Sequence, residues 1–125
     1  FYQKNQIIKN EPSNAQDDLK KVLSYIQENF NKPLTLDQIA QQIMITPNYL
    51  CRYFKKKMGM TVFQYMKQYR INKSIDLLLQ SDLSIINIAM QCGFDNLSYY
   101  IRTFKELTGL TPKQYRRQHT QQEIS

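Results

Sequence analysis

Two arginines that lie fifty residues apart have nearly the same neighbours in this sequence. Arg52 stands in Tyr-Leu-Cys-Arg-Tyr-Phe-Lys, and Arg102 stands in Tyr-Tyr-Ile-Arg-Thr-Phe-Lys. A guanidinium can donate two parallel hydrogen bonds to O6 and N7 of a guanine, and such a pair discriminates against a wrong base by about 1–3 kcal/mol. A phosphate contact or a plain surface charge is the alternative interpretation of each arginine.

The residues around both arginines follow the spacing of one helix face, i, i+3, i+4 and i+7. The first predicted outer face consists of Asn48, Cys51, Arg52 and Lys55. The second consists of Ser98, Ile101, Arg102 and Lys105, with Leu97 beside them at the N-terminal end. The opposite, inward faces consist of Leu50, Tyr53, Phe54, Tyr100, Thr103 and Phe104. Contact with a thymine methyl group would explain why Leu97 and Ile101 lie on an outer face.

A further set of side chains suits the DNA backbone rather than the bases. Phosphate contacts fix the register of a protein on a duplex and carry no direct sequence information. The residues expected in this role are Thr46, Lys55, Lys56, Lys57, Asn96 and Lys105.

The charge of the chain is basic and unevenly distributed. Seventeen Lys and Arg stand against ten Asp and Glu, which gives a formal net charge of +7. Residues 1–46 are neutral overall, whereas residues 47–117 hold twelve basic and four acidic side chains. This excess favours a polyanionic partner. Nonspecific binding to nucleic acid or to a membrane surface through charge alone is one alternative.

Both arginine contexts belong to an internal repeat. Eight of the 17 residues from Tyr49 to Tyr65 are identical to the residues fifty positions later, and Ile39, Ala40 and Gln42 recur at an offset of 49. The change of offset falls in the short turn between two helices, where an insertion costs little. Each unit consists of a short helix, a tight turn and a longer helix, which is the helix-turn-helix layout. A helical solenoid without a ligand is disfavoured because two units are too few.

Helix signals predict an all-α fold of seven helices. Helix starts are indicated at Ser13, Thr35, Thr46, Thr61, Ser84, Asn96 and Thr111. The two outer faces then fall on helices over residues 47–58 and 96–108. A long fourth helix runs to about Gln80, with Phe63, Met66, Ile71, Ile75 and Leu78 expected to face inward.

The predicted organisation consists of two homeodomain-like helix-turn-helix subdomains and three connecting or terminal parts. These are residues 1–14 as a linker or remnant of a missing N-terminal domain, 15–60 as the first subdomain, 61–81 as the bridging helix, 82–118 as the second subdomain, and 119–125 as a disordered tail. At 1.5 Å per residue, residues 62–80 of the bridging helix would span about 28 Å, so one chain is expected to reach two adjacent major-groove segments as a monomer.

Over residues 18–117 the chain resembles the AraC/XylS regulators. The likeness rests on Leu36-Asp37-Gln38-Ile39-Ala40, on Ile88-Ala89-Met90-Gln91-Cys92-Gly93-Phe94 with Ser98-Tyr99-Tyr100-Ile101-Arg102-Thr103-Phe104-Lys105, and on Gly109-Leu110-Thr111-Pro112-Lys113-Gln114-Tyr115-Arg116. The resemblance implies two helix-turn-helix subdomains bridged by a long helix. It implies base reading by Asn48, Cys51, Arg52, Leu97, Ser98, Ile101 and Arg102. Many members have Phe at the position of Tyr100, so the Tyr100 hydroxyl is expected to need a partner or an exposed edge.

The resemblance further implies a double-stranded DNA operator as the partner and a bacterial transcription regulator, usually an activator, as the whole protein. RNA polymerase is a further possible partner, and dimerisation of the full-length protein would use a missing N-terminal domain. A helical protein-interaction module and a repressor without activator function are the alternatives.

No residue set in the sequence suggests catalysis, metal binding or a cofactor. The single histidine, His119, has no Cys or Asp arrangement around it, and no Gly-rich phosphate loop is present. Cys51 and Cys92 have neither metal-site spacing nor the pattern of a disulfide framework, which favours the reducing cytoplasm. The five methionines, Met44, Met58, Met60, Met66 and Met90, are interpreted as core residues. There is no long apolar run, so no membrane segment is expected.

Overall fold

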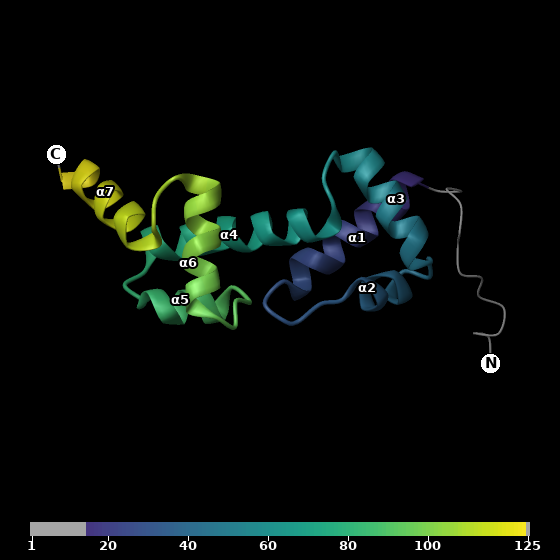
Figure 1. The fold of residues 1–125 in the computed structure, drawn as a ribbon, viewed down its shortest axis with the longest axis horizontal. Coiled ribbons are helices and arrows are strands. Elements are labelled where there is room, and N and C mark those ends of the chain that lie inside the picture. Colours follow the sequence, from purple (N-terminus) through teal and green to yellow (C-terminus); the bar gives the residue numbers. More distant parts are fainter. Residues whose placement is uncertain (1–14, 125) are drawn as a thin grey trace. The chain divides into compact units, whose positions relative to one another are not determined.

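The computed structural model describes the backbone of residues 15–124 and the side chains of residues 16–120. This part of the chain is all-α, as predicted. Its seven helices are α1 (Ala15–Asn29), α2 (Leu36–Gln42), α3 (Pro47–Met58), α4 (Val62–Gln80), α5 (Ile85–Gln91), α6 (Leu97–Thr108) and α7 (Pro112–Ile124), drawn in Figure 1. The capping signal at Ser13 and the expected linker of residues 1–14 lie outside the described residues.

Side-chain caps fix the helix starts at the positions that the sequence predicts. The Thr35 hydroxyl accepts the Gln38 amide proton while the Gln38 side chain accepts from the Thr35 amide, which is a capping box. The same reciprocal pair joins Thr61 to Gln64 before α4 and Thr111 to Gln114 before α7. These bonds satisfy amide groups that a helix N-terminus otherwise leaves without partners.

The first compact unit contains α1, α2, α3 and the first turn of α4, with residues 30–32 excluded. Its core joins the apolar stripe of α1 to the inward faces of α2 and α3. The buried members are Val22, Ile26, Ile39, Ala40, Ile45, Tyr49, Leu50, Tyr53, Phe54, Val62 and Met66. This packing presents the opposite face of α3 to solvent.

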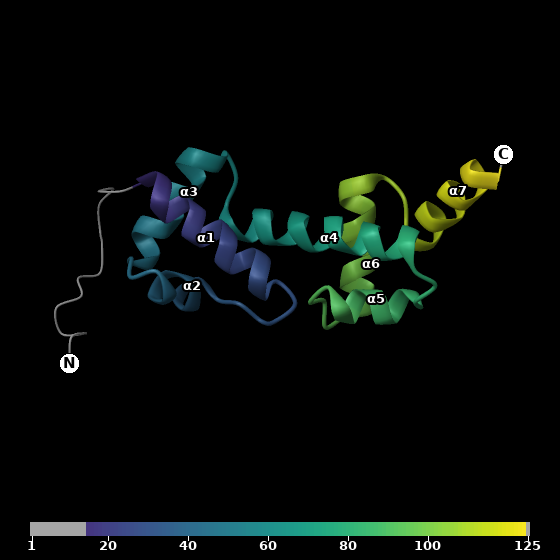
Figure 2. The same cartoon turned by 180° about the vertical axis from the view of Figure 1, so that it is seen from behind.

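The second compact unit contains residues 30–32 and the chain from Lys67 onward. Figure 2 shows α5 and α6 beside the C-terminal part of α4, which takes the place that α1 has in the first unit. The buried core consists of Ile71, Leu78, Ile88, Ala89, Cys92, Phe94, Tyr100 and Phe104. The boundary between the units falls inside α4, between Met66 and Lys67, so the predicted bridging helix of residues 61–81 is divided between them.

The turns of the two helix-turn-helix motifs differ by one residue, as the change of repeat offset indicates. Four residues separate α2 from α3, and five separate α5 from α6. Each turn contains a left-handed residue at the matching position, Met44 with φ of 61° and Gly93 with φ of 91°. A Cβ on Gly93 would lie 2.5 Å from the Phe30 carbonyl oxygen and 3.0 Å from Arg70 Nε. Glycine is therefore required in the second turn by both backbone conformation and space.

Arg116 of α7 closes the C-terminal end of α4. Its guanidinium donates to the carbonyl oxygens of Leu78, Ser81 and Leu83 at 3.0, 3.1 and 2.8 Å. The Leu78 carbonyl is one of those that the end of α4 leaves without an intrahelical partner, and the Ser81 and Leu83 carbonyls belong to the segment that follows the helix.

Two expectations about single residues are wrong. Phe63 is 56% exposed rather than inward-facing, because it lies in the first turn of α4 on the side away from the core. Met90 is 49% exposed rather than a core residue. Helix α7 extends to Ile124, into the segment 119–125 that the sequence predicts to be a disordered tail.

Candidate nucleic-acid interface

The predicted outer face of α3 is exposed. Asn48, Cys51, Arg52 and Lys55 are all exposed, whereas Tyr49, Leu50, Tyr53 and Phe54 are buried. The burial of Tyr49 was not anticipated. Because neither α3 nor α6 has an acidic residue in its first turn, the positive end of each helix dipole is not neutralised. We refer to α3 and α6 as the recognition helices.

The outer face of α6 is mixed. Ser98 and Arg102 are exposed, but Leu97 and Ile101 are only half-exposed, and both pack against the core of the second unit. The Arg102 guanidinium lies over the Tyr99 ring, 5.6 Å from its centroid. This cation–π contact holds the arginine along the helix surface.

Two residues expected to contact phosphates are helix caps in the structure. The Thr46 hydroxyl accepts the Tyr49 amide proton at 3.2 Å before α3. The Asn96 side chain accepts the Tyr99 amide proton at 2.8 Å before α6. Each residue therefore fixes the N-terminal end of a recognition helix. Lys55, Lys56 and Lys105 are exposed near the other ends of these helices.

A buried carboxylate anchors α3 to α1, and sequence analysis did not identify it. Asp18 is fully buried, and one of its oxygens accepts a hydrogen bond from the Tyr49 hydroxyl at 3.1 Å. Burial and then this hydrogen bond raise the pKa of Tyr49 to about 12. Burial also raises the pKa of Tyr53, with a further contribution from the Asp18 charge. The pairing of a first-turn Asp with a Tyr in α3 could not be inferred from either residue alone.

The corresponding interior of the second unit contains a tyrosine hydroxyl without a hydrogen-bond partner in the described residues. Tyr100 is fully buried, and its hydroxyl has neither the partner nor the exposed edge that the sequence led us to expect. Burial raises the pKa of Tyr100 to about 12, although the neighbouring Ser74 hydroxyl acts in the opposite direction. Ser74 donates its own proton to the Ile71 carbonyl oxygen at 2.7 Å.

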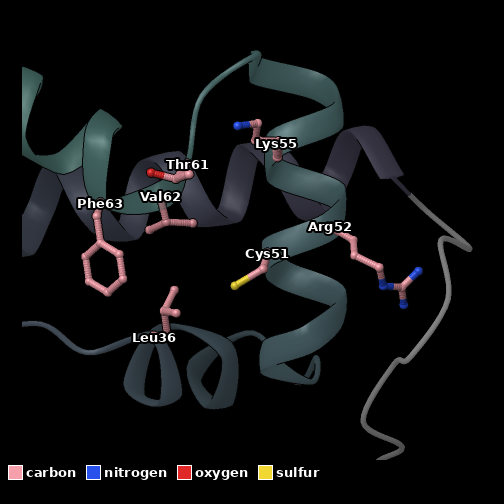
Figure 3. Close-up of a pocket in the computed structure, with 7 residues that line it drawn as sticks. All are labelled: Leu36, Cys51, Arg52, Lys55, Thr61, Val62 and Phe63. Atoms are coloured by element: carbon pink, nitrogen blue, oxygen red, sulfur yellow. The ribbon is translucent and has the colours of Figure 1, made fainter.

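The two cysteines have opposite environments. Cys51 is exposed on α3, and Cys92 is buried at the end of α5. Burial raises the pKa of the Cys92 thiol to about 11. Figure 3 shows the Cys51 thiol directed into a pocket beside α3, whereas the Arg52 side chain points away from that pocket. Both residues line this pocket, but only the Cys51 side chain is directed into it.

Neither a membrane span nor a metal cluster is found in the part of the chain that the structure describes. Within residues 15–124 no helix has the length and apolar character needed to cross a membrane. The same residues contain no group of three His, Cys, Asp or Glu side chains placed to hold a metal ion.

A family model described as a helix-turn-helix domain matches residues 39–118. Among curated proteins, the chain is 37% identical over 98 residues to the HTH-type transcriptional activator RhaR of Salmonella schwarzengrund. The aligned region covers 78% of this chain and 35% of RhaR. The chain spans between 13% and 35% of the length of the curated relatives compared with it.

Solved structures have the same fold. The C-terminal domain of AraT, a response regulator from Geobacillus stearothermophilus, is 33% identical with a TM-score of 0.80, over 85% of this chain and 88% of that chain. The DNA-binding domain of AdpA, solved in complex with a target DNA, is 21% identical with a TM-score of 0.82, over 86% of this chain and 97% of that chain, and at this identity it shows the fold alone. The two helix-turn-helix units, the matching family model and the similarity to these relatives agree. They show that the chain belongs to the AraC/XylS family of transcription regulators.

Proposed function

We propose that this chain is the sequence-specific double-stranded DNA-binding domain of a bacterial transcription activator. The recognition helices α3 and α6 each enter a major-groove segment of one operator. The observation that supports this most directly is the repeated exposed arginine, Arg52 and Arg102, at equivalent positions of two recognition helices. The chain acts by binding, without a catalytic step, in the cytoplasm where bacterial transcription takes place.

In this proposal the base contacts come from the exposed and half-exposed residues of the two outer faces. They are Asn48, Cys51, Arg52, Leu97, Ser98, Ile101 and Arg102. Arg52 and Arg102 pair with guanines, and the partly exposed surfaces of Leu97 and Ile101 contact thymine methyl groups. Lys55, Lys56 and Lys105 bind phosphates, and Thr46 and Asn96 contribute from the helix starts that they cap.

Competition between duplexes tests this proposal against binding by charge alone. A duplex selected from a random pool should be preferred over unrelated DNA by about 10³-fold or more at physiological salt. Equal competition by unrelated DNA would contradict sequence-specific reading. The fragment should bind one duplex as a monomer and protect two major-groove segments, which footprinting and sedimentation measure together.

Contact with RNA polymerase is a second candidate function, and the surface of α5 favours it. Ile86 and Met90 are 47% and 49% exposed, one helical turn apart. The equivalent positions of the first unit are the polar residues Asp37 and Gln41. Exchanging Ile86→Asp and Met90→Gln together should leave operator binding intact and lower activated transcription in vitro. Full activation of transcription by the double variant would contradict contact between α5 and RNA polymerase.

A further inference from the structure

A pocket opens beside the recognition helix of the first unit. Its volume is about 390 Å³, which lies in the size range of small-molecule sites. It is bounded by the first residue of α2, the outer side of α3 and the first residues of α4 (Figure 3). The lining residues are Leu36, Cys51, Arg52, Lys55, Thr61, Val62 and Phe63.

The interior of this pocket is apolar. Figure 3 shows the side chains of Leu36, Cys51 and Val62 directed toward one another, with the Phe63 ring at one side. Phe63 is 56% exposed, the largest exposed fraction among the exposed large apolar side chains in the described part of the chain. Covering such a ring removes apolar surface from water and favours an apolar occupant.

The rim of the pocket is cationic. Lys55 extends toward Thr61 in Figure 3, and no lining residue is acidic. Among the described residues, Lys55 has no ion pair with a carboxylate. Thr61 precedes the 19-residue helix α4, whose first turn contains no acidic residue to offset the positive end of its dipole. An apolar interior with this rim matches a ligand that has an apolar body and one negative charge.

Comparison of the two units shows which residues make the pocket. Leu36, Lys55 and Thr61 have close counterparts at the equivalent positions of the second unit, namely Ile85, Lys105 and Thr111. Cys51 and Phe63 do not, because the second unit has Ile101 and Lys113 there. A larger side chain replaces the thiol, a charged one replaces the aromatic wall, and Pro112 takes the place of Val62, so three of the lining residues are peculiar to the first unit.

We propose that this pocket binds a small carboxylic acid with an apolar body, and that the bound acid weakens the DNA contact of α3. The carboxylate pairs with the Lys55 ammonium at the start of α4, while the body packs against Leu36, Val62 and Phe63. The bound acid covers Cys51, neutralises Lys55 and repels nearby phosphates. The regulatory half of this inference rests on the proposed function, but occupancy of the pocket does not.

Binding is measured first without DNA, by alkylation of Cys51 with N-ethylmaleimide. Naphthalene-2-carboxylate and octanoate represent an aryl and an alkyl source of the same chemistry. The acid that fits should slow modification of Cys51 about tenfold or more at saturation, because a covered thiol is inaccessible. Naphthalene-2-carboxamide, which lacks the charge, should bind about tenfold more weakly than the carboxylate. Failure of both acids to protect Cys51 at millimolar concentration overturns the proposal.

Variants locate the site, and naphthalene fluorescence reports occupancy because the chain has no tryptophan. Cys51→Ile inserts the residue of the second unit and should abolish binding of the carboxylate, whereas Cys51→Ser keeps the space and should retain it. Lys55→Gln should weaken binding about tenfold, and the matched exchange Lys105→Gln should leave it unchanged. Equal effects of the two lysine exchanges, or undiminished binding to Cys51→Ile, contradict the assignment.

The effect of the acid on DNA binding is tested with Phe63→Gln. This exchange alters the pocket wall and leaves every residue assigned to DNA contact unchanged. On the wild-type chain, saturating acid should lower duplex affinity about tenfold or more and remove one of the two protected segments. Phe63→Gln should bind the duplex normally and lose this response. An equal response in Phe63→Gln, or no response despite protected Cys51, refutes the regulatory half. Sedimentation adds one check, since self-association that Cys51→Ile abolishes would assign the pocket to a second copy of the chain.

Discussion

Cys51 and Cys92 are the same side chain in two environments, one open to solvent and one buried in the core. Cys51 is exposed, whereas Cys92 is 1% exposed and its pKa is raised to about 11. Because only the thiolate reacts with maleimides, Cys92 should be modified at least about 100-fold more slowly than Cys51 at pH 8. Mass spectrometry of the two cysteine peptides measures both rates. A bound operator should protect Cys51, and rapid labelling of Cys92 in the folded chain would contradict its placement in the core.

Tyr100 and Tyr49 are two buried tyrosines whose hydroxyl groups have different surroundings. The Tyr100 hydroxyl has no hydrogen-bond partner in the described residues, so Tyr100→Phe should raise the free energy of unfolding by about 1 kcal/mol. The Tyr49 hydroxyl donates to the buried Asp18 carboxylate, so Tyr49→Phe should lower it by about 1–3 kcal/mol. Urea denaturation of both variants tests the contrast, and equal losses of stability would refute it.

The inward face of α3 could be predicted from the sequence, but its hydrogen bond to α1 could not. The helical spacing of apolar residues predicts the burial of Leu50, Tyr53 and Phe54, which lie on the inward face of α3 as expected. The Asp18–Tyr49 hydrogen bond was not, because it joins two residues 31 positions apart through packing that helix periodicity does not specify. Phe63 was assigned to the core because it fits an apolar stripe, although a first-turn residue can belong to that stripe and still lie outside the packed layer.

Glycine has two distinct roles in the turns and helix ends of this chain. Gly93 and Gly109 are both left-handed, but only Gly93 is crowded, by the Phe30 carbonyl and Arg70. Gly109→Ala should cost about 1–2 kcal/mol of stability, the conformational cost alone. Gly93→Ala should cost about 2–5 kcal/mol, because overpacking is added to that cost. Thermal or urea unfolding of the pair measures the difference. Equal costs would show that the second turn relaxes around an added methyl group.

Helix boundaries were the most predictable elements, because they depend on local chemistry. Thr35, Thr61 and Thr111 begin their helices through bonds to residues three positions on, and all of these residues are visible in the sequence. Arg116 is the opposite case. Its hydrogen bonds to the end of α4 and to the segment that follows span 33 to 38 residues, and no local signal in the sequence indicates which carbonyl groups accept them. The pocket beside α3 likewise forms only when α2, α3 and α4 are packed.

The positive charge of the chain should make its affinity for a DNA duplex depend on salt concentration. Residues 47–117, which contain both recognition helices, hold the basic excess. If about six phosphates are neutralised, log K against log salt should have a slope near −5 for a selected duplex. Titrations between low and physiological salt measure it. Lys56→Ala should make the slope less steep and weaken all sequences alike, whereas a slope near zero for the unaltered chain would exclude a polyanionic partner.

The most direct test of the account is the preferred duplex of the Arg52→Ala and Arg102→Ala variants, selected from a random pool beside the unaltered chain. Each variant should lose preference at one base pair, the two positions should differ, and each substitution should cost about 1–3 kcal/mol of binding free energy on the original site. Lys56→Ala, the phosphate control, should return the original sequence. An unchanged preferred sequence for both arginine variants would contradict base reading by the repeated arginines.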